Sequence, residues 1–171
     1  MRKDATLLLL MALSLVGCSK SSTATKNTPP PPSLEAKDSE GNSALLRAVN
    51  TGDTIEVRRL VEAGADVNSA SNSGVTPLMN AAGMGNKETV ELLIKKGADV
   101  NHRTSGNYTA LMQAALVGQT EIVKVLLDAG ADPSVKDTSG RTAAAYAQEQ
   151  KHDELAQLLK QKTGAQSAGK N

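Results

Sequence analysis

Apolar residues along this chain recur in short clusters with helical spacing, and the clusters come in pairs. In one pair, Leu78, Ala81 and Ala82 fall at positions i, i+3 and i+4, which places them on one face of a helix. Gly85 then interrupts the helical pattern, and a second apolar face follows within residues 90–94. The pattern predicts two short helices joined by a tight turn.

This paired arrangement repeats with a period of 33 residues. The tripeptide Gly-Ala-Asp begins at 64, 97 and 130, and threonine recurs at 76, 109 and 142. Glycine keeps the same spacing at 52, 85 and 118. A fixed period of this size predicts a stacked array in which each unit covers the apolar face of its neighbour. Arrays of this kind favour binding as the class of function.

The residues between the apolar clusters suit this arrangement. Thr76 and Thr109 stand where a helix begins, and a threonine hydroxyl there accepts a hydrogen bond from a backbone N–H group. Gly97 follows the last turn of a predicted helix, where a left-handed backbone is favoured. Asn107 occupies the position of Gly74 in the previous unit, and asparagine tolerates left-handed backbone better than most residues. The aspartates at 66, 99 and 132 are predicted to stabilise turns.

The units resemble ankyrin repeats. The second unit carries Thr76-Pro77-Leu78-Met79-Asn80-Ala81-Ala82, then Gly85, Val90-Glu91-Leu92-Leu93 and Gly97-Ala98-Asp99. The resemblance implies an all-α solenoid of about four helix-turn-helix repeats with short finger turns, at about 38–70, 71–103, 104–136 and 137–162. The terminal units fit less well, and the last has Lys151 where a glycine is expected.

The resemblance also implies where a partner protein would bind. In ankyrin repeat proteins the partner usually meets the concave side, formed by the finger tips and the first helix of each repeat. Carried over position by position, the candidate binding residues are Val75, Met84, Arg103, Tyr108, Leu116, Val117 and Arg141. The apolar members form a strip rimmed by polar groups, which is typical of interaction sites. The alternative is that Leu116 and Val117 only pack between adjacent repeats.

Composition and charge exclude several other functions. The chain has 171 residues and a net charge of +1, which does not favour nucleic-acid binding. Its two histidines, His102 and His152, have no partner at a metal-ligand spacing, and we expect His102 to be a solvated turn residue. No cluster of polar residues suggests a catalytic centre. We therefore expect no enzymatic activity, metal, cofactor or small-molecule substrate.

The first residues have the pattern of an export signal. Arg2 and Lys3 precede an apolar segment, residues 5–16, that is too short to cross a bilayer. The run Leu15-Val16-Gly17-Cys18 resembles the bacterial lipobox, and Cys18 is the only cysteine in the chain. The resemblance implies a lipoprotein signal peptide at 1–17 and an acylated, palmitate-bearing Cys18. An ordinary secretory signal with an incidental cysteine is the alternative.

The segments around the repeats are polar. Residues 18–37 are rich in Ser, Thr, Lys and Pro and are predicted to form a disordered tether, and residues 163–171 a flexible tail. Ser19 and Lys20 after the cysteine favour the periplasmic face of the outer membrane over retention at the inner membrane.

Together these features predict a membrane-anchored, non-catalytic protein that binds or supports another protein of the cell envelope. An inhibitor or immunity protein that caps an envelope-targeted toxin or enzyme is the alternative. An enzyme would need a convergent polar cluster, which the sequence does not offer.

Overall fold

The computed structural model describes residue 34 and residues 36–168, with side chains described to residue 164. The described part contains eight helices and no strand, as the all-α prediction requires. They are α1 (Ala44–Thr51), α2 (Thr54–Glu62), α3 (Pro77–Met84), α4 (Lys87–Lys95), α5 (Ala110–Val117), α6 (Thr120–Asp128), α7 (Ala143–Glu149) and α8 (Asp153–Ala168). Cys18, the apolar segment before it and most of the predicted tether lie outside the described residues.

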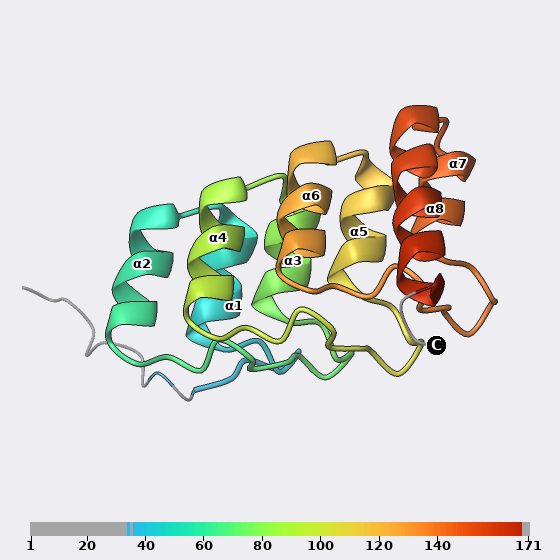
Figure 1. Ribbon diagram of the computed structural model, residues 1–171. Helices are drawn as coiled ribbons and strands as arrows, with labels where there is room; N and C mark the ends of the chain where they lie inside the picture. Colours follow the sequence, from blue (N-terminus) through green and yellow to red (C-terminus); the bar gives the residue numbers. More distant parts are fainter. Residues whose placement is uncertain (1–33, 35, 169–171) are drawn as a thin grey trace, which may run out of the picture. The chain divides into compact units, whose positions relative to one another are not determined.

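Each repeat contributes one helix to each of two layers (Figure 1). The odd-numbered helices pack against one another more closely than the even-numbered helices do. Small residues explain the difference, because the odd-numbered helices meet through fully buried alanines such as Ala81 and Ala114. The long loops that connect the repeats run along one edge of the described array.

The core consists of columns of equivalent side chains that pass from repeat to repeat. Leu93 of α4 is fully buried, and its equivalents in α2, α6 and α8 are Leu60, Leu126 and Leu159, each at most 1% exposed. A second column of equivalent positions comprises Val57, Val90, Val123 and Ala156. Because these equivalent side chains belong to one continuous buried core, neighbouring repeats stabilise one another.

The predicted helix caps are present. The Thr76 hydroxyl accepts a hydrogen bond from Met79 N at 3.4 Å, and the Thr109 hydroxyl accepts one from Met112 N at 3.3 Å. Pro77 occupies the first turn of α3, where its missing N–H group costs nothing. Asn107 adopts the left-handed conformation with φ 57°, as its alignment with Gly74 predicts, and Lys151 does so with φ 62°.

Two asparagines join successive repeats on the loop edge. The Asn68 side chain donates to Gly97 O at 3.1 Å and accepts from Asp99 N at 2.8 Å. One period later, Asn101 makes the same pair of hydrogen bonds to Gly130 O and Asp132 N. The predicted aspartate turns are also formed, because Asp66, Asp99 and Asp132 each accept a hydrogen bond from the backbone N–H two residues ahead.

The array extends beyond the boundaries predicted for it. Leu34, in the segment predicted as a tether, packs against the core, and the Lys37 ammonium donates to Ala70 O at 3.1 Å. At the other end, α8 continues to Ala168, whereas the sequence analysis placed the tail from residue 163. The polar composition of both segments favoured a tether and a tail. Contact with the neighbouring loop orders the described residues before the first repeat, and continuation of α8 orders residues 163–168.

Gly97 has φ +88° and no atom close to the site of an added Cβ, so a substitution there meets only backbone strain. Gly97→Ala is expected to lower the free energy of unfolding by about 1–2 kcal/mol, the cost of left-handed backbone for an L-residue. Urea denaturation measures the loss. Gly106→Ala is the control, because Gly106 is not left-handed and has room for a methyl group. A stabilising Gly97→Ala would show that the left-handed backbone is not required.

Candidate binding surface

The predicted apolar strip is centred on the C-terminal ends of α3 and α5. Met84 and Val117 are equivalent residues one repeat apart, and their side chains are 49% and 44% exposed. Each directly precedes a left-handed glycine that ends its helix, Gly85 or Gly118. The glycine turns the backbone away at this point, which leaves the preceding side chain uncovered. Met84 and Val117 are therefore accessible at the surface.

The other apolar candidates are less accessible. Val75, Tyr108 and Leu116 are half-buried, and all three pack against the core. For Leu116 the structure thus combines the two interpretations of the sequence, since part of the side chain packs and part remains exposed. These three residues form the base of the surface rather than its most exposed contacts.

A row of polar residues lies beside the strip on the odd-numbered helices. Equivalent positions carry Arg47, Asn80, Gln113 and Tyr146. The Asn80 amide donates to the Asn50 side-chain oxygen, which joins α3 to α1. Gln113 covers Gly83, because a Cβ at Gly83 would lie 2.6 Å from the Gln113 amide nitrogen. Contacts between repeats thus fix the Asn80 and Gln113 amides at the surface.

The fingers beside this row are closed by the same device in all four repeats. In the second repeat, Ser71 N donates to Val75 O at 3.0 Å, and Val75 N donates to the Ser71 hydroxyl at 3.2 Å. In the third repeat, Thr104 and Tyr108 make the equivalent pair. The first and last repeats use aspartate at this position, Asp38 and Asp137. Because both ends of each finger are fixed, the surface is formed before any partner binds.

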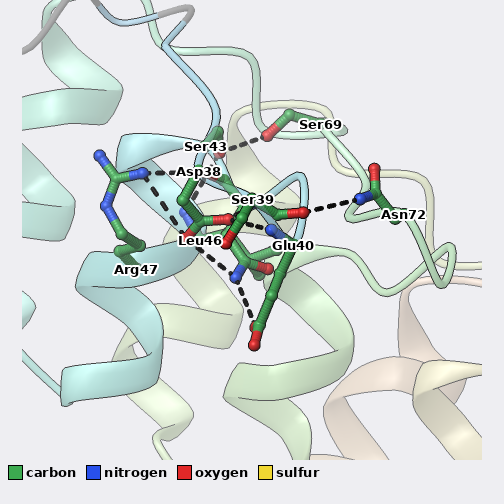
Figure 2. Close-up of polar contacts among 9 residues, drawn as sticks. Asp38, Ser39, Glu40, Ser43, Leu46, Arg47, Ser69 and Asn72 are labelled. Carbon is green, nitrogen blue, oxygen red and sulfur yellow. Dashed lines mark hydrogen bonds and ion pairs between the residues drawn. The ribbon is translucent and has the colours of Figure 1, made fainter.

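The first finger shows the acidic version of this device (Figure 2). The Asp38 carboxylate accepts hydrogen bonds from Asn42 N at 2.8 Å and Glu40 N at 3.0 Å, and the Asn42 backbone bond is the main cause of its lowered pKa. Arg47 of α1 lies 3.9 Å from the same carboxylate and donates to Asn42 O. Figure 2 also shows Asn72 of the second finger, whose side chain donates to Ser39 O. The first two fingers are thereby joined.

The last finger carries a denser polar cluster. Asp137 is buried, and its carboxylate accepts from the Tyr146 hydroxyl at 2.6 Å and from Arg141 Nε at 3.2 Å. Arg141 also lies over the Tyr146 ring, with Cζ 4.4 Å from the centroid, and 3.5 Å from Glu149. Tyr108 meets the Tyr146 ring edge-on, with the ring centroids 5.4 Å apart. We name Tyr108, Asp137, Arg141 and Tyr146 the terminal cluster.

Electrostatics in the terminal cluster favour one protonation state. The hydrogen bond from Tyr146, followed by those from Arg141 and Ser139, lowers the pKa of Asp137 to about 2, although burial opposes the shift. Burial, followed by the Asp137 hydrogen bond, raises the pKa of Tyr146 to about 12. Burial also raises the pKa of Tyr108. The Asp137 carboxylate is therefore ionised and both phenols are neutral at physiological pH. The terminal cluster thus holds the last finger in place through fixed hydrogen bonds and does not act as an acid–base pair.

The structure divides the seven sequence-predicted residues into groups. Met84, Leu116 and Val117 lie at the helix ends, and Tyr108 and Arg141 belong to the terminal cluster. Arg141 is committed to Asp137, Glu149 and Tyr146, whereas Arg103 is exposed and has no ion pair within the described residues. The sequence analysis missed Asp137 and Tyr146. Aligning the repeats gives the signal, since they replace Thr104 and Gln113.

Neither histidine forms a catalytic or metal site with described residues. His102 is half-buried, and its Nε2–H donates to Gly74 O at 3.2 Å, so the prediction of a solvated turn residue is wrong. The His152 ring lies against Gly118, where a Cβ would be 2.6 Å from it. Among the described residues no group of three His, Cys, Asp or Glu side chains is placed to hold a metal ion. No helix in this part of the chain is long and apolar enough to cross a membrane.

Comparison with known proteins agrees with the repeat geometry. A family model of ankyrin repeats in three copies matches residues 9–104, and a second model of ankyrin repeats in many copies matches residues 93–147. A search of curated proteins found no match. The first match covers more than half of the chain, and helix pairs, caps and left-handed turns recur along the described residues. The chain therefore belongs to the ankyrin repeat family.

Proposed function

We propose that this protein is anchored in the bacterial cell envelope and binds another protein there through the surface around Met84 and Val117. Ankyrin repeats suggest a protein–protein interaction role, and they are generally non-catalytic modules. The observation that carries the choice of surface is the exposure of two equivalent apolar side chains, one repeat apart, on neighbouring helices. Exposed apolar groups rimmed by polar residues often mark interaction sites.

The rigidity of this surface supports the same proposal. The fingers are closed by reciprocal hydrogen bonds, and the Asn50, Asn80 and Gln113 side chains are held between repeats. A surface that is already ordered loses little conformational entropy when a partner binds. Half-buried Tyr108 adds an aromatic side chain of the kind that often dominates binding energy.

Substitution of the two exposed residues tests the binding surface. The full chain and its Met84→Ser, Val117→Ser variant are used to capture proteins from a detergent extract of the cell envelope. Ile55→Ser is the matched control, because Ile55 on α2 is 84% exposed but lies in the other helix layer. We expect one partner to be retained by the parent and the control and lost by the double variant, with unchanged circular dichroism. Equal capture by all three would place the binding site elsewhere.

The anchor is the second part of the proposal and rests on the residues before Cys18. Cys18→Ser is expected to abolish labelling by radioactive palmitate and to release the protein from the membrane fraction. Retention of the label would show that Cys18 is not the acylated residue. An inhibitor of an envelope-targeted toxin would use the same surface, and the identity of the captured partner distinguishes inhibition from support of a resident protein.

A further inference from the structure

Basic residues recur at the position directly before three of the four fingers. Lys37, Arg103 and Lys136 are separated by multiples of 33 residues, and all three are exposed. Ala70 occupies this position before the second finger. We name Lys37, Arg103 and Lys136 the finger row. It lies next to the fingers that border the proposed binding surface.

The gap that Ala70 leaves in the row is filled by Lys37. The Lys37 ammonium donates to Ala70 O at 3.1 Å, so its charge lies beside the second finger and not the first. The finger row therefore presents one cation at each of three successive fingers, the second, third and fourth. This arrangement is visible only in the structure, because the composition of residues 18–37 predicts a disordered tether that includes Lys37.

The row is not neutralised by the carboxylates of the fingers. Asp38 lies beside Arg47, and Asp137 is bound by Arg141. Neither Arg103 nor Lys136 has an ion pair in the part of the chain that the structure describes. The aspartate before Arg103 in the same loop, Asp99, turns its carboxylate to the Asn101 N–H. Within the described part of the chain, the finger row is thus a line of positive charge that forms no ion pair, beside fingers whose own aspartates are already paired.

We propose that the finger row binds an acidic, extended segment of the partner protein. The inference rests on the proposed function, because it assumes that the partner meets the finger side of the array. Packed helices are about 8–10 Å apart, and an extended polyproline II chain rises about 3.1 Å per residue with three residues per turn. Carboxylates at every third residue of such a segment lie on one face and therefore fall opposite successive cations of the row. Charge complementarity of this kind fixes register and raises the association rate.

A synthetic peptide tests the inference without knowledge of the partner. The probe is a fluorescein-labelled 12-residue peptide with glutamate at every third position among serine and glycine, and binding to the full chain is followed by anisotropy at low salt. We expect binding that weakens at least tenfold when salt rises to about 1 M, where the Debye length is about 3 Å. The same peptide with glutamine in place of glutamate should not bind.

Charge reversal locates the site. Arg103→Glu, Lys136→Glu is expected to reduce the affinity for the acidic peptide at least tenfold. Lys95→Glu, Lys96→Glu is the matched control, because these lysines are also exposed but lie at the end of α4, and we expect less than a twofold effect. Absence of peptide binding, or an equal loss in both variants, would overturn the inference.

A membrane surface is the competing source of negative charge. Vesicles of phosphatidylcholine with and without phosphatidylglycerol are therefore titrated with the same three proteins. Binding to the anionic vesicles that depends on the finger row, without binding of the peptide, would show that the row faces lipid and would refute an acidic protein partner. Either result is independent of the capture experiment with Met84 and Val117, so failure of this inference is distinguishable from failure of the proposed function.

Discussion

Replacing Leu93 with alanine is expected to lower the free energy of unfolding by about 2–5 kcal/mol. Leu93 is fully buried in α4, between Leu60 of the preceding repeat and Leu126 of the following one in the same column of equivalent positions. Truncation removes apolar contacts and leaves a cavity, because neighbours fixed by their own repeats relax only in part. Urea denaturation followed by circular dichroism measures the loss.

The position of Leu93 in an interior repeat adds a second expectation. In a repeat array, stability is approximately the sum of the repeats and the interfaces between them, so a cavity in the second repeat weakens the interfaces on both sides. Leu92→Ala is the control, because Leu92 is adjacent in sequence but only half-buried, and its loss should be smaller. A reduced slope of the unfolding transition in Leu93→Ala would show that the array no longer unfolds in one step. A change near zero would mean that Leu93 is not buried.

The features that the sequence predicts correctly are those that every repeat needs. Leu93, Thr76 and Gly97 belong to positions where the same physical demand, burial, capping or left-handed backbone, occurs once per period. Each time such a residue recurs, the sequence repeats the same evidence for burial, helix capping or left-handed backbone at that position. For this reason the helix pairs and their turns could be predicted from one sequence without knowledge of any contact between repeats.

The features that the sequence does not predict come from positions where the repeats differ. Lys37 lies before the first finger and contacts Ala70 before the second, and His102 lies before the third finger and contacts Gly74 of the second, so each contact depends on how neighbouring loops pack. The exposure of the candidate surface has the same origin, since Leu116 and Val117 are adjacent in sequence yet differ in burial. These contacts and this exposure both depend on the direction in which a side chain points relative to the next repeat. The periodicity of the sequence does not reveal that direction.

The terminal cluster is the clearest example, and Tyr146 provides its sharpest test. Tyr146→Phe is expected to lower the free energy of unfolding at pH 7 by about 1.5–3 kcal/mol, the usual contribution of a hydrogen bond to a charged group. The phenylalanine keeps the ring against Arg141 and Tyr108 but removes the hydroxyl that donates to Asp137 at 2.6 Å. The buried carboxylate then loses its shortest hydrogen bond while its negative charge remains.

The pH dependence of this loss identifies its cause. The pKa of Asp137 is lowered to about 2, with the Tyr146 hydroxyl as the largest cause beside the hydrogen bonds from Arg141 and Ser139, whereas an unfolded aspartate has a pKa of about 3.9. A carboxyl with a lowered pKa stabilises the folded state above its unfolded pKa, and that stabilisation disappears as the pH falls through the folded value. The difference between the parent protein and Tyr146→Phe should therefore be constant above about pH 5 and should shrink between about pH 4 and pH 2.

Tyr108→Phe is the matched control for this prediction. Tyr108 shares the ring contact with Tyr146, but its hydroxyl makes no hydrogen bond to any described residue, so its removal should change stability by less than about 0.5 kcal/mol. A loss in Tyr146→Phe that does not vary with pH would mean that packing, and not the carboxylate, is responsible. In that case the Asp137 carboxylate would be stabilised by its hydrogen bonds from Arg141 and from the Ser139 N–H. The expected result would instead show that the hydrogen bond between Tyr146 and Asp137 stabilises the fourth repeat.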